Sequence, residues 1–135
     1  MTGRRLTACL TVRRAAKARL LLAFTGLLAG DPARADLASE RRFSACTDQV
    51  TQAQKAGVLY ALDWAPPDEP RVVAGPAFFQ LPIDRKQAFV ESVNCYLLHG
   101  KGGPCVNFDV DHWKTGKPVG RYSFCLFRMK RRVVE

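Results

Sequence analysis

The chain has 135 residues, with 21 lysines and arginines against 12 aspartates and glutamates, and its formal net charge is +9 at pH 7. This length leaves room for one ordinary domain and excludes a multidomain protein. So large a positive charge would suggest a nucleic-acid-binding protein, and the placement of the charge along the chain decides whether that class applies.

Residues 1–35 have the three-part pattern of a secretory signal peptide. Basic residues come first, an apolar run of about eleven residues occupies 20–30, and Ala33 and Ala35 fit an A-x-A cleavage site. The run is too short for a membrane-spanning helix, which needs about 20 residues. We therefore expect Sec-type export and removal of residues 1–35. The alternative is a buried N-terminal helix of the folded protein.

Removal of this leader changes the charge balance. The leader holds seven of the 21 basic residues and one of the 12 acidic ones, so residues 36–135 carry 14 and 11, a net charge of +3. This value argues against nucleic acid as a partner. We expect residues 128–135 to form a solvated basic tail, with a weak contact to lipopolysaccharide, an anionic membrane or an acidic partner as the alternative. Its cations are Arg128, Lys130, Arg131 and Arg132.

Four cysteines remain after the leader, and they are Cys46, Cys95, Cys105 and Cys125. An even number of cysteines in a small exported domain indicates two disulfide bonds. The absence of a C-x-x-C pair argues against a redox centre or a zinc knuckle. No asparagine lies in a glycosylation motif, which fits a bacterial periplasm or the medium outside the cell.

Residues 36–127 are expected to form a single small α+β domain. Apolar residues at steps of three and four predict an amphipathic helix over residues 37–56. Alternating residues predict a strand at 58–64 and, after a proline-rich turn, a second strand at 71–74.

A second helix is expected over residues 84–98, where Asp84 and Gln87 form a capping-box-like start. Small residues line one side of this helix, so another helix could approach it closely there. Just before it, Phe78 and Phe79 are expected to form a hydrophobic plug beneath the helix. The alternative is an exposed aromatic pair that binds a partner. The glycine-rich residues 99–104 end the helix in a flexible loop.

Residues 105–110 and 121–126 alternate in polarity and predict the two arms of a hairpin. If facing residue numbers add to 230, Phe108 meets Tyr122 and Val106 meets Phe124 on the buried face. On the other face Asp109 meets Arg121. The same register places Cys105 opposite Cys125, at a separation that a disulfide tolerates.

The hairpin register therefore favours a Cys105–Cys125 disulfide. By elimination Cys46 then pairs with Cys95, which places the first helix along the small residues of the second. A local Cys95–Cys105 bridge is the alternative. The predicted fold has the order α-β-β-α-β-β, with both helices on one face of a four-stranded, mostly antiparallel sheet.

Two groups of residues near the hairpin tip are candidate sites. Trp113, with Lys114 and Lys117 beside it, could stack on a sugar ring or anchor a partner's surface. Asp109, Asp111 and His112 are the nearest approach to a metal or acid–base cluster. We expect a charged surface there and no metal, since Asp109 has a partner in Arg121.

No catalytic signature and no cofactor motif is found in the chain. The leading hypothesis is a small exported, non-catalytic binding or accessory protein of the bacterial envelope, which acts through loop tips and an exposed sheet face on an envelope protein or glycan. One alternative is a small secreted enzyme that uses Asp109, Asp111 and His112. Another is a structural component of an envelope assembly.

Overall fold

The computed structural model describes residues 32–131, and the chain divides into two compact units, Met1–Asp36 and Leu37–Glu135. Most of the predicted signal peptide, residues 1–31, and the predicted tail residue Arg132 lie outside the described residues. The fold described below is that of the second unit.

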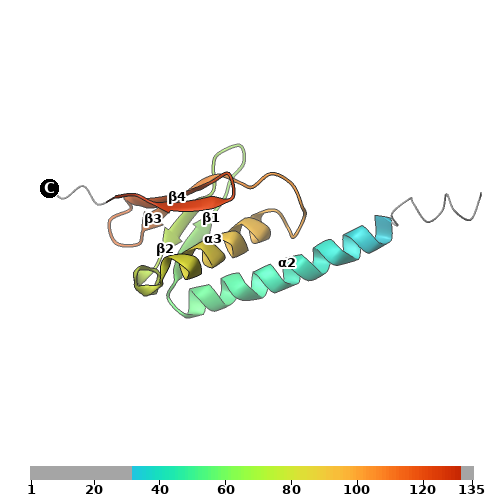
Figure 1. Cartoon of the computed structure of the whole chain (residues 1–135), viewed down its shortest axis with the longest axis horizontal. Helices are drawn as coiled ribbons and strands as arrows, with labels where there is room; N and C mark the ends of the chain where they lie inside the picture. The colour runs from blue at the N-terminus through green and yellow to red at the C-terminus, as the bar shows by residue number, and fades with distance from the viewer. Residues whose placement is uncertain (1–31, 132–135) are drawn as a thin grey trace, which may run out of the picture. The chain divides into compact units, whose positions relative to one another are not determined.

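The described residues form two α-helices, one 3-10 helix and five strands (Figure 1). In chain order they are α2 (Pro32–Lys55), β1 (Leu59–Asp63), β2 (Arg71–Ala74), η1 (Pro76–Gln80), α3 (Ile83–Leu97), β3 (Phe108–His112), β4 (Pro118–Ser123) and β5 (Leu126–Met129). The strands lie in one sheet in the order β1-β2-β3-β4-β5. The α+β class is therefore confirmed.

The sheet is mixed and five-stranded, so the expected four strands are wrong, and one neighbouring pair of the expected mostly antiparallel sheet is parallel. Strands β2 and β3 are parallel, with Arg71 beside Asp109, whereas the other neighbouring pairs are antiparallel. The reason is the connection, since α3 carries the chain back along the sheet before β3 begins. A crossover of this kind joins parallel strands, and a tight hairpin joins antiparallel ones.

The fifth strand arises because the second arm of the predicted hairpin is interrupted. Strand β4 ends at Ser123, Phe124 and Cys125 form a two-residue turn, and β5 runs back along β4. The predicted pairs of Phe108 with Tyr122 and of Asp109 with Arg121 are present. The predicted burial of Phe124 against Val106 is wrong, because the turn leaves Phe124 88% exposed.

The strand β5 also changes the boundary of the predicted basic tail. Arg128 and Met129 lie inside β5, so the domain extends at least two residues beyond residue 127. The Lys130 amide then donates a hydrogen bond of 2.8 Å to the Val119 carbonyl. Pairing with β4 thus continues to Lys130, and residues 128–130 of the predicted tail are attached to the sheet.

The hydrophobic core lies on the side of the sheet that α3 covers, and both helices contribute to it (Figure 1). Phe78 of η1 is fully buried and packs edge-to-face against Phe89 of α3 and Phe127 of β5. The Phe127 ring lies directly over Gly120 of β4, where a Cβ atom would meet it at 2.5 Å. Residue 120 must therefore be glycine for the ring to pack there.

Helix α2 packs against α3 at the predicted line of small residues. The Cys46–Cys95 disulfide joins the two helices, and the Ser92 hydroxyl donates a hydrogen bond of 2.7 Å to the Gln49 side-chain oxygen. At the end of α3, a Cβ atom on Gly100 would collide with the backbone of α2. Close helix packing therefore depends on small side chains, as the sequence predicted.

The second disulfide, Cys105–Cys125, ties the β4–β5 turn to the loop that leads into β3. The side chain of Gln87, from α3, holds the same turn. Its amide nitrogen donates to the Cys125 carbonyl at 3.2 Å, and its oxygen accepts from the Phe127 amide at 2.8 Å. Both predicted disulfide pairings are thus present, and disulfides are consistent with a protein outside the cytoplasm. Within residues 32–131 no helix is long and apolar enough to cross a membrane.

Candidate functional site

A hollow of about 510 Å³ lies at the end of the sheet where the β3–β4 turn and the end of β5 meet, and we call it the hairpin pocket. Its lining residues come from η1, from both sides of the β3–β4 turn and from the chain at the end of β5. They are Pro76, Phe79, His112, Trp113, Pro118, Val119, Met129, Lys130 and Arg131. Pockets of this volume are of the size that holds small molecules.

Aromatic rings form one wall of the hairpin pocket. The His112 ring lies between Phe79, at a centroid distance of 4.8 Å, and Trp113, at 6.1 Å and nearly parallel. Trp113 remains 40% exposed, and its backbone amide donates a hydrogen bond of 3.1 Å to the Ala74 carbonyl. The indole is therefore accessible although its backbone is fixed to β2.

His112 presents one hydrogen-bond donor. Its Nδ1 accepts a hydrogen bond of 3.0 Å from the Lys114 amide. A neutral imidazole whose Nδ1 is an acceptor carries its proton on Nε2. The hairpin pocket thus has a polar N–H group beside its aromatic wall.

Cations border the same pocket. Lys130 and Arg131 line it, and no ion pair of either is found among residues 32–131. Both belong to the predicted basic tail. Arg128, by contrast, lies opposite Arg121 on the sheet. The pocket therefore combines aromatic surface, a donor and positive charge, which suits an anionic ligand with a ring.

The predicted binding residues are only partly brought together. Trp113 and Phe79 line the hairpin pocket, whereas Phe78 is buried in the core and forms the hydrophobic plug that was the leading interpretation. Lys114 and Lys117 lie in the β3–β4 turn and do not line the pocket. They act through their backbones, since the Lys117 carbonyl accepts from the His112 amide at 2.9 Å.

Asp109 and Asp111 lie away from His112, on the other side of the sheet. Asp111 forms an ion pair with Arg71 at 3.2 Å, and Asp109 forms one with Arg121 at 3.3 Å. Alternate residues of a strand share one face, so His112 lies on the same face of β3 as the buried Phe108 and Val110. Its ring therefore lies on the core side, beside Phe79. Within residues 32–131 no group of three or more His, Cys, Asp and Glu side chains is placed to hold a metal ion.

The charges on the outer face of the sheet are largely paired with one another. Arg121 donates hydrogen bonds to both Glu69, at 3.0 Å, and Asp109, at 3.3 Å. The carboxylates of Glu69 and then Asp109 raise the pKa of the Arg121 guanidinium above its ordinary value. Together with the Arg71–Asp111 ion pair, this network engages both of the predicted aspartates.

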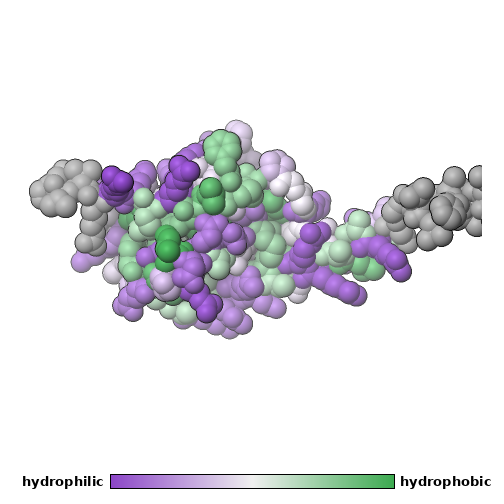
Figure 2. Space-filling view, in the orientation of Figure 1, coloured by the Kyte–Doolittle hydropathy of each residue, from purple (hydrophilic) through white to green (hydrophobic). Residues whose placement is uncertain are grey.

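Hydrophobic and hydrophilic residues are interspersed on the face of the domain that Figure 2 shows. Phe124, at the β4–β5 turn, is the most exposed of the large hydrophobic side chains.

Sequence reasoning did not find the residues that complete the hairpin pocket. Pro118, Val119 and Met129 carry no chemical signature, and they reach the pocket because β4 and β5 bring them beside Trp113. The alternation of Leu126, Phe127, Arg128 and Met129 was the available sequence signal for a further strand after β4, which is β5. The chain matches no protein-family model, no curated protein and no solved structure.

Proposed function

We propose that this protein is an exported, non-catalytic binding protein of the bacterial envelope, and that the hairpin pocket binds an acidic sugar of an envelope glycan. The observation that carries the proposal is the meeting of the exposed Trp113 with Lys130 and Arg131 in one pocket. An indole stacks on the apolar face of a pyranose ring, and cations bind its carboxylate. The Nε2–H of His112 supplies a further donor.

The arrangement of the polar groups supports binding in preference to catalysis. The Nδ1 atom of His112 is already engaged by a backbone amide, and Asp109 and Asp111 are engaged by arginines on the other face of the sheet. A general base must itself lie within hydrogen-bond reach of the proton that it removes, with a lone pair free to accept it. The enzyme alternative therefore has less support than the binding hypothesis.

Export remains part of the proposal and rests on the leader pattern of residues 1–35 together with the two disulfides. Unreduced mass spectrometry of the protein from its native cell tests it. We expect a chain that begins at Asp36 and contains Cys46–Cys95 and Cys105–Cys125. A chain that begins at Met1 with free thiols would contradict export.

Binding is tested by calorimetric titration with oligogalacturonate, an acidic glycan that carries carboxylates. The control ligand is the neutral glycan with the same linkage, which carries none. We expect Trp113→Ala to weaken binding at least about tenfold, since aromatic anchors of interfaces contribute on this scale. Lys130→Gln should weaken it less and should reduce its dependence on salt.

Trp64→Ala is the matched control, because it removes the other tryptophan of the chain from a separate part of the surface. Its affinity for oligogalacturonate should equal that of the unmodified protein. Equal binding of the neutral glycan, or binding that survives Trp113→Ala, would count against the acidic-sugar proposal.

A further inference from the structure

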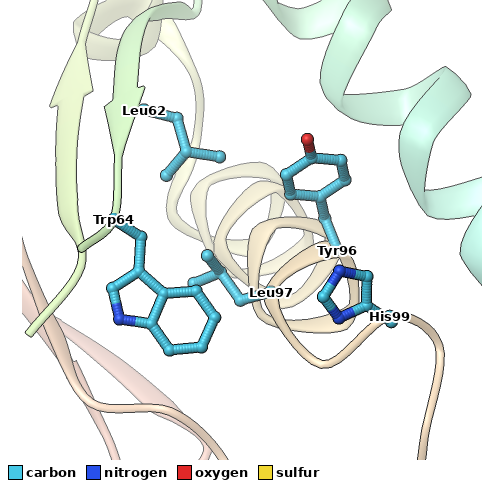
Figure 3. A pocket seen from close by; sticks show the side chains of 5 residues that line it. All are labelled: Leu62, Trp64, Tyr96, Leu97 and His99. Atoms are coloured by element: carbon cyan, nitrogen blue, oxygen red, sulfur yellow. The ribbon is translucent and has the colours of Figure 1, made fainter. Parts of the chain in front are cut away.

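A second hollow, of about 280 Å³, lies between the end of β1 and the end of α3, and we call it the helix-end pocket. Figure 3 shows Leu62 and Trp64 on the strand side of this pocket, with residues of the helix end opposite them. The lining residues are Leu62, Trp64, Tyr96, Leu97 and His99. It shares no residue with the hairpin pocket.

Contacts outside the helix-end pocket fix its walls. The Trp64 indole N–H donates a hydrogen bond of 3.1 Å to the Asp68 carbonyl, so the ring is held by its polar edge. Behind the pocket, Phe43 of α2 stacks on Tyr96 at 5.7 Å and packs against His99 at 5.1 Å. A ligand would therefore meet a surface that is already formed, which lowers the entropic cost of binding.

His99 brings an imidazole to the helix-end pocket from a left-handed backbone at the end of α3. His99 directly follows the helix end and has a φ of 51°, in the left-handed region where glycine is preferred. The neighbouring Gly100, with a φ of 69°, follows this preference. The His99 ring lines the helix-end pocket.

Two polar groups of the pocket are available to a ligand. Within residues 32–131, no hydrogen bond of the Tyr96 hydroxyl or of the His99 ring nitrogens is found, and neither is buried without a partner. The Trp64 N–H, in contrast, is taken by Asp68. The pocket thus combines the aliphatic and aromatic side chains of Leu62, Trp64 and Leu97 with two hydrogen-bonding groups, Tyr96 and His99, from the end of α3 (Figure 3).

We propose that the helix-end pocket binds a monocyclic aromatic molecule with one hydrogen-bonding oxygen, that is, a simple phenol. The ring would lie between Leu62, Trp64 and the nearly buried Leu97, and its hydroxyl would bond to Tyr96 or His99. The volume of about 280 Å³ is large enough for one substituted ring. This site is independent of the proposed glycan binding.

The experiment uses p-cresol as the probe, titrated into the isotope-labelled, disulfide-bonded protein while amide and indole resonances are followed by NMR. We expect saturable shifts centred on Leu62, the Trp64 indole and His99. The resonances of Trp113 and its neighbours should not move. No saturable shift at the helix-end pocket up to the solubility limit of p-cresol overturns the proposal, and so do shifts centred on Trp113.

Two substitutions test the polar groups. Tyr96→Phe keeps the ring stacked on Phe43 and removes the hydroxyl, and it should weaken p-cresol binding about fivefold, as expected for the loss of one hydrogen bond. Tyr60→Phe is its matched control, because Tyr60 is exposed and lies beside Trp113, at 6.4 Å. It should leave the affinity unchanged.

His99→Gly separates binding from folding. Glycine suits the left-handed backbone at this position, which offsets the loss of the ring contact with Phe43, so the variant should remain folded while p-cresol binding weakens. Unchanged affinity in both His99→Gly and Tyr96→Phe would show that the hydroxyl is not recognised, and would overturn the assignment of a phenol.

Discussion

The two tight turns of the sheet differ in what determines their shape. The β3–β4 turn, residues 113–117, follows the usual turn chemistry, with Gly116 at a φ of 67° and the Thr115 hydroxyl accepting a hydrogen bond from the Lys117 amide. The β4–β5 turn consists of Phe124 and Cys125, with φ values of 51° and 62°. Turns with positive φ at both central residues favour Asn-Gly, and a phenylalanine there is unusual.

The comparison shows that a turn can be determined by residues far from it in the sequence. Nothing in the sequence around Phe124 favours a turn. The disulfide to Cys105 and the two hydrogen bonds of Gln87 hold it instead. Local preference determines the first turn, and tertiary contacts determine the second.

The largest expected effect comes from removing the disulfide at the second turn. The double variant Cys105→Ala, Cys125→Ala should lose about 3 kcal/mol of the free energy of unfolding, the scale for a loop of this length. Denaturant titration measures the loss. Hydrogen exchange should show reduced protection of the Phe127 amide, with the Gly116 amide unchanged. Equal loss of protection at both turns would contradict the comparison.

A smaller loss is expected for Gln87→Ala, which removes both hydrogen bonds between α3 and the second turn. The free energy of unfolding should fall by about 1 to 2 kcal/mol, because the partly buried Phe127 amide loses its partner. Gln52→Ala, on the exposed side of α2, is the control and should change stability by less than about 0.5 kcal/mol. The comparison fails if the two variants are equally stable.

Opposite effects are expected from glycine exchanges at the two turns. Gly116→Ala should destabilise the protein by about 1 kcal/mol, because the left-handed backbone disfavours a side chain even where there is space for it. Phe124→Gly should stabilise it by a similar amount, since the exposed ring contributes no core packing. Thermal unfolding of both variants checks the signs. A loss of stability in Phe124→Gly would mean that the ring makes a stabilising contact.

The smallest effect concerns Tyr122, which lies one residue before Ser123 at the base of the second turn. Burial of the phenol raises its pKa above 10.0, mainly through desolvation. Above that pH the unfolded chain releases the proton and the folded protein retains it, so stability should fall as pH rises further, by at most about 1.4 kcal/mol per unit. Tyr122→Phe should lack this additional slope in denaturant titrations from pH 9 to 11. Equal slopes would indicate that the phenol is solvated.

Much of the fold could be predicted because its determinants are close in sequence or repeat regularly. The 3.6-residue spacing predicted α3, and the alternation of Phe108, Asp109 and Val110 predicted their register with β4. The same register predicted the Cys105–Cys125 bridge. The parallel pairing of β2 with β3 depends on a crossover, and strand β5 depends on the tertiary contacts of the β4–β5 turn. Local sequence patterns do not record either one.

The candidate sites show the same division. Trp113 and His112 were apparent from composition and position, but the pocket they line also needs Met129 and Lys130, which another strand supplies. The helix-end pocket was not predicted at all. Its residues lie on β1 and at the end of α3, and each taken alone has an ordinary structural explanation in the sequence.

The contact between Gln87 and the Phe127 amide also occupies a hydrogen-bond donor on the outer edge of the sheet. Strand β5 is an edge strand of the sheet. Phe127 lies opposite Tyr122 in a non-hydrogen-bonded pair, so the Phe127 amide points away from β4. An unpaired amide of this kind is a template onto which a strand of another molecule can add, the first step toward fibrils. Because the Gln87 side chain already occupies this donor, an incoming strand must displace a helix side chain before it can pair.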